Sequence, residues 1–204
     1  MIERFRLEGS EHPNFIGCWV LKNLDLCDEL VEVFESNQNM QKPGVTAERK
    51  IQEEIKKSTD ITIAPNELEK EKFHSVSKYV QHLKICYLDY IEQWDFLKSS
   101  MPVMHIGPFN LQRYQKGDHF GALHAERTRL SRAHRTFAWM TYLNDVLEGG
   151  ETIFPMFGVS VKPVRGKTLL WPSEWTHAHL GKAVEKGNKY IITGWMHFPD
   201  EKYL

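Results

Sequence analysis

Apolar residues recur at helical spacing in two segments of the first hundred positions. In residues 23–37 they return at steps of three and four, which predicts an amphipathic helix with Asn23 or Asp25 as its N-cap. The apolar positions of this segment are Leu26, Leu30, Val33 and Phe34. A second, longer helix is predicted to begin after Asn66, where Asn66 and Glu69 resemble a capping box. Its apolar stripe consists of Phe73, Val76, Val80, Leu83, Tyr87, Tyr90, Ile91 and Trp94.

From about residue 105 the pattern changes to short strand-like runs that are separated by turn signals. These runs are residues 109–114, 135–143, 151–154, 159–163, 167–172 and 189–198. Turn signals stand at residues 148–151 (EGGE) and 186–188 (KGN), and no long helical pattern follows residue 105. Many short strands with tight turns predict antiparallel sheets arranged as a sandwich or a barrel.

The two patterns suggest one domain that covers residues 1–204. A helical support region, residues 1–105, would pack as a layer outside a β core formed by residues 106–200. Within the helical region, residues 37–67 are polar and contain Pro43 and Gly44, so we expect a long, partly ordered loop there. The fold class predicted from this organisation is mainly β with flanking helices.

Composition narrows the class of protein. Apolar residues make up 41% of the chain, enough for a sizeable core, and the formal net charge is −1. A near-neutral chain argues against a general nucleic-acid or membrane-surface binder, which would carry a basic surplus. No apolar run is long enough to cross a bilayer, and the first residues do not resemble a signal peptide. The three cysteines include no CxxC pair, so we expect a cytoplasmic protein with reduced thiols.

The first candidate for chemistry is the pair His124 and Glu126. On a strand, residues two apart share a face, so these side chains would point together and Ala125 would point away. An imidazole and a carboxylate can chelate a divalent metal ion, and a second histidine would complete the 2-His-1-carboxylate facial triad of non-haem Fe(II) oxygenases. His177 and His179 both offer that histidine, and strand parity does not distinguish them. The alternative is a surface histidine beside a solvated glutamate.

The second candidate is the lysine that begins the last apolar strand. Lys189, Ile191, Thr193 and Trp195 alternate to one side of this strand. A lysine that faces into a barrel needs an anionic partner, because burying its charge unpaired is very costly. Alternatively, the lysine lies at the mouth of the strand and extends its ammonium group to water.

Four segments of residues 109–198 together resemble the prolyl 4-hydroxylase-like branch of the Fe(II)/2-oxoglutarate-dependent dioxygenases. They are 111–126 (LQRYQKGDHFGALHAE), 140–155 (MTYLNDVLEGGETIFP), 161–172 (VKPVRGKTLLWP) and 179–195 (HLGKAVEKGNKYIITGW). Each segment alone is a modest match, but their order along the chain is specific. The match is less distinct in the first hundred residues, where residues 14–35 and 55–61 are similar to marine bacterial and phage members of the branch.

The resemblance implies a double-stranded β-helix, or jelly-roll, core and an Fe(II) ion held by His124, Glu126 and His179. In this family the distal histidine precedes a basic residue by ten positions, which selects His179 over His177 through its interval to Lys189. Most of the family has aspartate where this chain has Glu126. The extra methylene moves the carboxylate by roughly one C–C bond but keeps the same ligand chemistry.

The resemblance also implies 2-oxoglutarate as co-substrate and O2 as oxidant, with ascorbate as a reductant. The far carboxylate of 2-oxoglutarate would bind Lys189, with Thr193 helping there, and Tyr114 and Tyr142 would offer their hydroxyls to the co-substrate. For each tyrosine the alternative is core packing with the hydroxyl satisfied elsewhere. Trp195 is expected to pack the pocket floor. The implied reaction hydroxylates an aliphatic C–H bond and releases succinate and CO2.

A basic segment follows Glu126 closely. It contains Arg127, Arg129, Arg132, His134 and Arg135. Either these residues form a solvated loop that pairs with nearby glutamates, or some of them face the site entrance and favour an anionic substrate. By resemblance alone, Lys57, Ser58 and Asp60 belong to a loop that covers the substrate.

Three functions compete at this point. The leading one is an Fe(II)/2-oxoglutarate hydroxylase acting on a small molecule or a peptide, with peptidyl proline the substrate that the resemblance most suggests. The second is a jelly-roll module that binds a partner without turnover, and the third is a cupin-like enzyme with another metal. A buried lysine argues against both alternatives, because neither needs to bind a dicarboxylate. A nucleobase substrate is disfavoured by the neutral charge and the lack of a base-stacking pattern.

Overall fold

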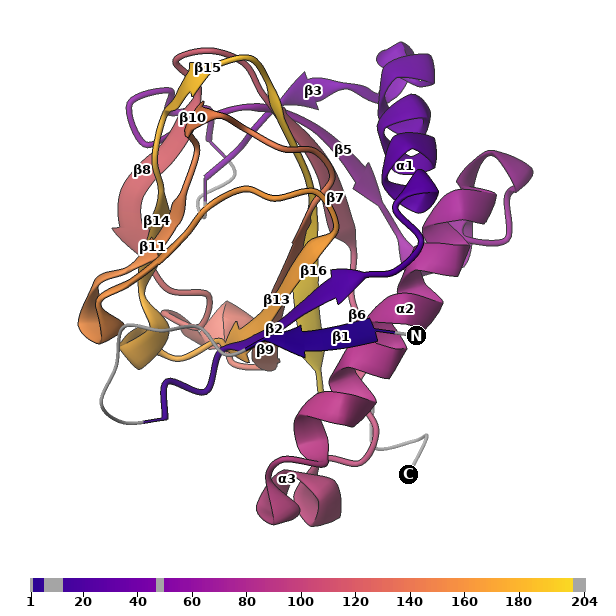
Figure 1. Cartoon of the computed structure of the whole chain (residues 1–204), viewed down its shortest axis with the longest axis vertical. Helices are drawn as coiled ribbons and strands as arrows, with labels where there is room; N and C mark the ends of the chain where they lie inside the picture. Colours follow the sequence, from indigo (N-terminus) through magenta and orange to yellow (C-terminus); the bar gives the residue numbers. More distant parts are fainter. Residues whose placement is uncertain (1, 6–12, 47–49, 200–204) are drawn as a thin grey trace.

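The computed structural model describes residues 2–5, 13–46 and 50–199. Two β-sheets face each other and enclose a barrel (Figure 1). The helices α1 (Asp25–Ser36) and α2 (His74–Ile91) lie along the outer side of the larger sheet. The other helical elements are α3 (Asp95–Ser100) and six short 3₁₀ turns, η1 (Gln38–Met40), η2 (Pro65–Glu67), η3 (Glu71–Phe73), η4 (Leu130–Arg132), η5 (Pro155–Phe157) and η6 (Trp175–His177), counted over the described residues.

Within the described residues the larger sheet has nine strands and the smaller has five, and every pairing is antiparallel. The larger sheet runs β1 (Ile2–Phe5), β2 (Gly17–Leu21), β13 (Lys167–Pro172), β9 (Arg135–Tyr142), β16 (Lys189–His197), β7 (Phe109–Tyr114), β5 (Thr59–Ile63) and β3 (Lys42–Pro43), with β6 (His105–Ile106) beside β16. The smaller sheet runs β12 (Val159–Val161), β11 (Thr152–Phe154), β14 (His179–Gly181), β8 (His119–His124) and β4 (Lys56–Lys57). A two-stranded ribbon joins β10 (Glu148–Gly149) to β15 (Val184–Lys186).

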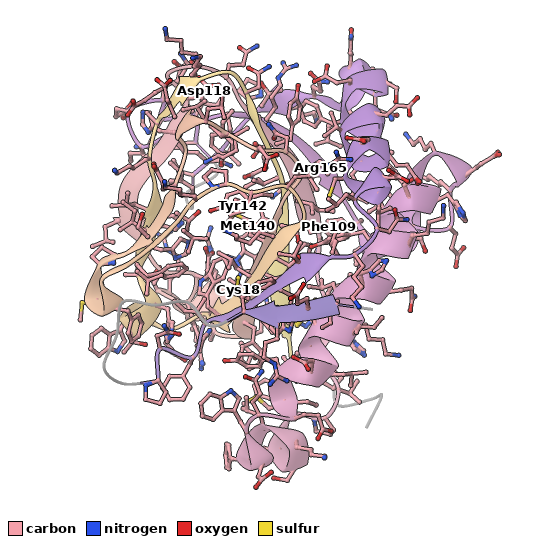
Figure 2. All side chains as sticks on the ribbon, viewed as in Figure 1. Cys18, Phe109, Asp118, Met140, Tyr142 and Arg165 are labelled. Atoms are coloured by element: carbon pink, nitrogen blue, oxygen red, sulfur yellow. The ribbon has the colours of Figure 1, made fainter. Side chains whose placement is uncertain are left out.

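The larger sheet is buried on both faces, which explains why its central strands are almost continuously apolar. On β9, Phe137 and Trp139 face the helices, whereas Ala138, Met140 and Tyr142 face the barrel interior. Figure 2 shows the side chains that fill these two layers. The alternation places one apolar core between sheet and helices and a second core inside the barrel.

A chain of buried hydroxyl groups ties α2 to the larger sheet. Tyr79 on α2 shares a hydrogen bond of 2.7 Å with Thr141 on β9, and Thr141 shares another of 2.7 Å with Thr168 on β13. All three side chains are fully buried or nearly so. Because each hydroxyl has a partner, the polar atoms are accommodated without the cost of an unsatisfied buried group.

The β half of the chain follows the predictions closely. The runs 109–114 and 167–172 are β7 and β13 with the expected bounds, and the runs 135–143 and 189–198 are β9 and β16 to within one residue. Among the described residues after 105, the only helical elements are short 3₁₀ turns. The expectation of a mainly β fold with a jelly-roll core is confirmed.

The first half requires three corrections. Neither predicted residue is the N-cap of α1: the cap is Leu24, and Asn23 instead accepts the backbone N–H of Asp25 at 3.2 Å. The expected box at Asn66 is also wrong, because Pro65 starts a separate 3₁₀ turn in which Glu67 accepts the N–H of Ala64. The predicted loop at residues 37–67 contains the strands β3, β4 and β5.

The structure also bears on the membrane-spanning segments and the cysteines considered from the sequence. Across the described residues, we find no helix with the length and the apolar character that a bilayer-spanning segment needs. Cys18, Cys27 and Cys86 are free and buried, and burial raises the pKa of these thiols to about 11, 11 and 12. The thiols are therefore protonated and poorly reactive at neutral pH.

Gly194 offers a direct test of the close packing between β16 and its neighbours. A Cβ at this position would lie 2.6 Å from the Cβ of Phe109 and 2.6 Å from the ring of Trp139, and neither group can move freely. We expect Gly194→Ala to lower the free energy of unfolding by about 1–3 kcal/mol, as overpacked cores do. Gly181→Ala is the matched control, because its nearest neighbours would be 3.8 Å away. Equal melting temperatures for the two variants would contradict this account.

Candidate metal centre

The register between β8 and β14 brings two histidines together. His124 ends β8, His179 begins β14, and the two are direct partners across the antiparallel ladder. Side chains at paired positions of a ladder lie side by side, and the two imidazole centroids are 4.4 Å apart. Glu126 lies two residues beyond His124 and just outside the strand, with its carboxylate turned back toward both rings.

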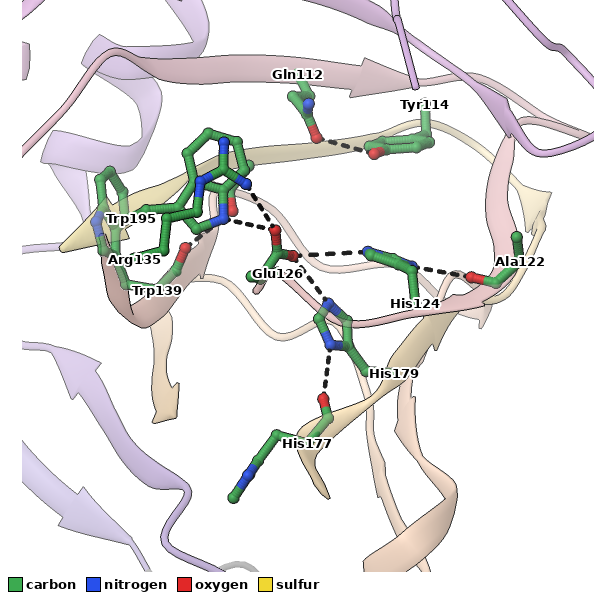
Figure 3. Close-up of polar contacts among 11 residues, drawn as sticks. Gln112, Tyr114, Ala122, His124, Glu126, Arg135, Trp139, His177, His179 and Trp195 are labelled. Carbon is green, nitrogen blue, oxygen red and sulfur yellow. Dashed lines mark hydrogen bonds and ion pairs between the residues drawn. The ribbon is translucent and has the colours of Figure 1, made fainter. Parts of the chain in front are cut away.

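The three side chains converge on one point. Glu126 Oε1 is 3.7 Å from Nε2 of His124 and 3.6 Å from Nε2 of His179, and one ligand atom from each residue lies within 4.8 Å of the others. Figure 3 shows the carboxylate between the two imidazoles. This group is what the sequence suggested from His124 and Glu126, with His179 as the second histidine.

The far nitrogen of each imidazole is engaged by a backbone carbonyl. Nδ1–H of His124 donates to the carbonyl of Ala122 at 2.9 Å, and Nδ1–H of His179 donates to that of His177 at 3.0 Å. A carbonyl accepts only, so the proton of each neutral ring is on Nδ1. The lone pair of each Nε2 therefore points to the centre of the group, as in metal-binding histidines.

Electrostatics favour a neutral His179 and a charged Glu126. Burial, followed by the neighbouring His124, lowers the pKa of His179 to about 4. Burial alone would raise the pKa of Glu126, but the histidines, Arg135 and Trp195 outweigh it and bring the pKa below its ordinary value. Two imidazole nitrogens and one anionic oxygen on one side of a cavity fit a divalent transition metal with open coordination positions.

His177, the other histidine left open by strand parity, is directed away from this group. Its Nε2–H donates to the carbonyl of Asn14 at 2.9 Å, and its Nδ1 is 3.0 Å from the hydroxyl of Thr176. Both ring nitrogens are therefore used in packing the turn η6 against the N-terminal segment. The structure brings together His179, and not His177, with His124 and Glu126.

The histidine–glutamate group opens into a cavity of about 1090 Å³ between the two sheets. Lys189, Ile191, Thr193 and Trp195 all line it, as the alternation along the strand predicts. The Lys189 side chain is 3% exposed, so it does not extend to water. Its ammonium group donates to the carbonyl of Gly150 at 3.1 Å.

Lys189 is buried without a counter-ion in the described part of the chain, where no carboxylate lies within 4.0 Å of its nitrogen. Burial lowers its pKa to about 8, although Glu151 acts in the opposite direction. The ring of Tyr114 lies 4.5 Å below the ammonium group and supplies a cation–π contact. The cost of burying this charge indicates that an anion is needed to complete the site.

The three predicted hydroxyl residues are placed differently from one another. Tyr114 lines the cavity, but its hydroxyl donates to Gln112 Oε1 at 2.8 Å. Thr193 lines the cavity and donates to the carbonyl of Trp139 at 2.8 Å. Tyr142 does not line the cavity, and its hydroxyl donates to Thr152 at 2.6 Å. For Tyr142 this placement matches the core-packing alternative, because direct contact with a ligand would require breaking the bond to Thr152.

The cavity wall contains a buried ion pair that the sequence did not predict. Lys56 donates to Asp60 Oδ2 at 2.6 Å, and Asp60 also accepts from Ser58 at 2.7 Å and from Gln112 at 2.9 Å. In the expected covering loop, Lys57 ends β4, Asp60 belongs to β5, and Ser58 lies between the two strands, with Ser58 and Asp60 buried. Gln112 and Tyr114 are two residues apart on β7 and therefore share a face of the strand. This alternation could have predicted that Gln112 faces the cavity and joins the polar wall formed by Lys56, Asp60 and Gln112.

The basic segment divides between the cavity and the surface. Arg127 is exposed, pairs with Glu174 at 2.6 Å and does not line the cavity. Arg129, Arg132, His134 and Arg135 do line it. Arg135 lies 3.5 Å over the ring of Trp195, and burial lowers its pKa to about 10.

Trp195 lines the cavity, in agreement with its expected packing there, and it also makes a polar contact that was not expected. Its indole N–H donates to Glu126 Oε2 at 2.6 Å, so it contacts a member of the metal centre (Figure 3).

Comparisons with known proteins agree with this geometry. Residues 109–197 match the family model of the 2OG-Fe(II) oxygenase superfamily. The chain is 28% identical over 141 residues to probable prolyl 4-hydroxylase 9 of Arabidopsis thaliana, covering 56% of this chain and 49% of that protein. It is 33% identical over 75 residues to the alpha-1 subunit of prolyl 4-hydroxylase of Bos taurus, covering 33% of this chain and 14% of that protein. The chain thus spans about half of the first relative and a smaller part of the second.

Solved structures share the fold. A Pseudomonas putida prolyl-4-hydroxylase aligns with a TM-score of 0.68 and 19% identity, covering 90% of this chain and 92% of that one. A prolyl hydroxylase of Trichoplax adhaerens, in complex with a peptide of hypoxia inducible factor, aligns with a TM-score of 0.68 and 18% identity over 93% and 85% of the two chains. His124, Glu126, His179 and Lys189 all lie within the matched range of residues 109–197. Residues 109–197 are therefore similar to the 2OG-Fe(II) oxygenase superfamily, and the partial sequence matches within this similarity are to prolyl 4-hydroxylases.

Proposed function

We propose that this protein is an Fe(II)- and 2-oxoglutarate-dependent dioxygenase that hydroxylates an aliphatic C–H bond and releases succinate and CO2. One observation carries the proposal. A facial set of two imidazoles and one carboxylate shares a single cavity with a buried lysine that has no carboxylate partner in the described residues. A metal ion at one end and a cation at the other match the two ends of a short α-keto dicarboxylate. Residues 106–200 would form the catalytic core of a single domain.

His124, Glu126 and His179 would hold the ferrous ion, because their ligand atoms already converge and two of their outer nitrogens are fixed by carbonyls. Bound Fe(II) and 2-oxoglutarate supply the oxidising power for the C–H bond. Lys189 would bind the far carboxylate of the co-substrate, and the apolar barrel interior would exclude water. A charge-assisted hydrogen bond in such a site is stronger than one in water.

Tyr114 and Thr193 would support the co-substrate as hydrogen-bond acceptors or through reorientation of their hydroxyls, since both line the cavity. Tyr142 would act one step further away, by holding Thr152, which lines the cavity. We also propose ascorbate as the reductant that keeps the iron ferrous. A cytoplasmic location is proposed as well, supported by the three free cysteines.

The charges that line the cavity support an anionic substrate. Its cationic side chains are Lys42, Lys56, Arg129, Arg132, Arg135 and Lys189. Among the described residues that line the cavity, the only carboxylates are Asp60 and Glu126. Asp60 offsets Lys56, and 2-oxoglutarate would offset Lys189, while the cationic side chains that line the cavity outnumber its carboxylates. Since several relatives are prolyl hydroxylases, we propose a prolyl peptide with acidic flanking residues as the substrate class.

Single substitutions of His177 and His179 test which histidine belongs to the proposed metal centre. With Fe(II) and 2-oxoglutarate under anaerobic conditions, the wild type should develop a weak visible charge-transfer band, and succinate should form on admission of air. We expect His179→Gln to abolish both signals, because it removes one of three ligands. His177→Gln is the control and should keep both signals, since its ring nitrogens face Asn14 and Thr176. Loss of the band in both variants, or in neither, would refute the assignment.

The pH dependence of co-substrate binding tests Lys189. Its pKa of about 8 means that the charged form is lost as the pH rises through that value. We expect the Kd of 2-oxoglutarate for the Mn(II)-loaded protein, measured by calorimetry, to rise about tenfold per pH unit above pH 8. Lys189→Arg should flatten this dependence because arginine stays charged. The exposed Lys182→Arg should preserve it. A slope that is the same in all three proteins would rule out this role for Lys189.

Substitutions of Arg129 and Arg127 distinguish the anionic-substrate proposal from the alternative that the basic segment is a solvated loop. The probes are a proline-containing peptide flanked by glutamates and its serine-flanked counterpart. We expect the acidic peptide to have the lower KM, and Arg129→Gln to raise that KM by about two- to fivefold, the cost of one partly exposed charge pair. Arg127→Gln should leave it unchanged, because Arg127 pairs with Glu174 outside the cavity. Equal KM values for the two peptides would exclude an acidic preference.

A further inference from the structure

The two oxygens of the Glu126 carboxylate have different surroundings. Oε1 faces the metal-binding nitrogens of His124 and His179 at 3.7 and 3.6 Å. Oε2 faces the opposite way, where it accepts the indole N–H of Trp195 at 2.6 Å and a guanidinium N–H of Arg135 at 3.3 Å. The carboxylate therefore has one oxygen toward the metal centre and the other occupied by two donors (Figure 3).

Both donors are held rigidly by the larger sheet. Trp195 lies on β16 and Arg135 begins β9, and these strands are paired over most of their length. The Arg135 guanidinium stacks 3.5 Å over the Trp195 ring, so each side chain limits the movement of the other. Glu126 follows β8 of the smaller sheet. Its carboxylate thus connects the two sheets, with the histidines on one side and the two donors on the other.

The length of the side chain matters for this connection. Glutamate is longer than the family's usual aspartate by one methylene, or about 1.5 Å along the chain. At 2.6 Å, the bond to Trp195 is already as short as strong charge-assisted hydrogen bonds are. A shorter carboxylate from the same backbone position would have to give up either the indole N–H or the approach to the histidines.

We propose that Trp195 and Arg135 are positioning residues that hold Oε2 of Glu126 and so make this ligand bind the metal through Oε1 alone. This inference rests on the proposed function. Without the two donors the carboxylate could rotate and bind through both oxygens, which would fill a fourth coordination position. Three open positions are needed for the two atoms of 2-oxoglutarate and for O2. Trp195 and Arg135 would therefore preserve both metal affinity and the space for co-substrate.

Co(II), bound under anaerobic conditions, is the probe for the test because its visible spectrum reports coordination number. Trp195→Phe removes the N–H donor and keeps a ring on which Arg135 can stack. We expect this variant to bind Co(II) about 10–100-fold more weakly, as loss of an outer-shell partner does. We also expect the spectral change on adding 2-oxoglutarate to be reduced. Arg135→Gln should weaken Co(II) binding in the same direction but less, because its contact is longer.

Trp171→Phe is the matched control. Trp171 also lines the cavity and packs against the His179 ring, with centroids 5.0 Å apart, but its indole N–H has no hydrogen-bond partner. This variant should bind Co(II) within about twofold of the wild type, since it removes no donor to Glu126. Glu126→Asp completes a double-mutant cycle. If the donors act through the glutamate, Trp195→Phe should add little to the loss already caused by Glu126→Asp.

The possible outcomes distinguish failure of the proposed function from failure of the positioning role of Trp195 and Arg135. A wild type that binds no Co(II) would overturn both the proposed function and the positioning role. A wild type that binds Co(II), together with unchanged affinity and spectra in both Trp195→Phe and Arg135→Gln, would overturn the positioning role alone. Equal losses in Trp195→Phe and Trp171→Phe, or additive losses in the cycle with Glu126→Asp, would also overturn it. If Trp195→Phe does not fold, as judged by circular dichroism, Arg135→Gln decides the question.

Discussion

The direct pairing of His124 with His179 across two antiparallel strands is the contact on which the site depends. It fixes two imidazoles side by side, with no long flexible segment between backbone and ligand atom. Carbonyls of the same backbone then hold each ring with its lone pair inward. Glu126 follows two residues later and needs only to fold back over the pair. A shift of one residue in this register would turn one histidine to the other face of the sheet and dismantle the group.

The rest of the cavity is organised around two opposite charges kept apart. At one end the carboxylate of Glu126 gives the metal centre its negative charge, and at another Lys189 is buried over the ring of Tyr114. Neither group is neutralised by the other. In a protein interior this separation is costly, and it is tolerated where a ligand of matching charge completes it. The polar wall of Lys56, Asp60 and Gln112 behaves differently, because its charges and hydrogen bonds are satisfied internally.

The β half could be predicted from the sequence, because strand alternation and short turns leave a strong local pattern. Alternation also predicted that His124 and Glu126 point together, whereas only the family resemblance selected His179 over His177 as the side chain that joins them. Lys189, Ile191, Thr193 and Trp195 line the cavity as parity requires. The strands at residues 42–63 were not predicted, since β3 and β4 are two residues long and their polar side chains resemble a loop. The hydrogen bond of Trp195 to Glu126 and that of Tyr142 to Thr152 could not be predicted either. Both depend on how separate elements pack against one another in three dimensions, which no local pattern encodes.

A crystal structure of the protein with Mn(II) and 2-oxoglutarate, with anomalous scattering to locate the metal, tests the central claim most directly. We expect one metal ion bound by Nε2 of His124, Nε2 of His179 and Oε1 of Glu126. The α-keto acid end of 2-oxoglutarate should lie on that ion, and its far carboxylate should contact the Lys189 ammonium group. A metal peak elsewhere, or a co-substrate that leaves Lys189 without an anion, would contradict the account.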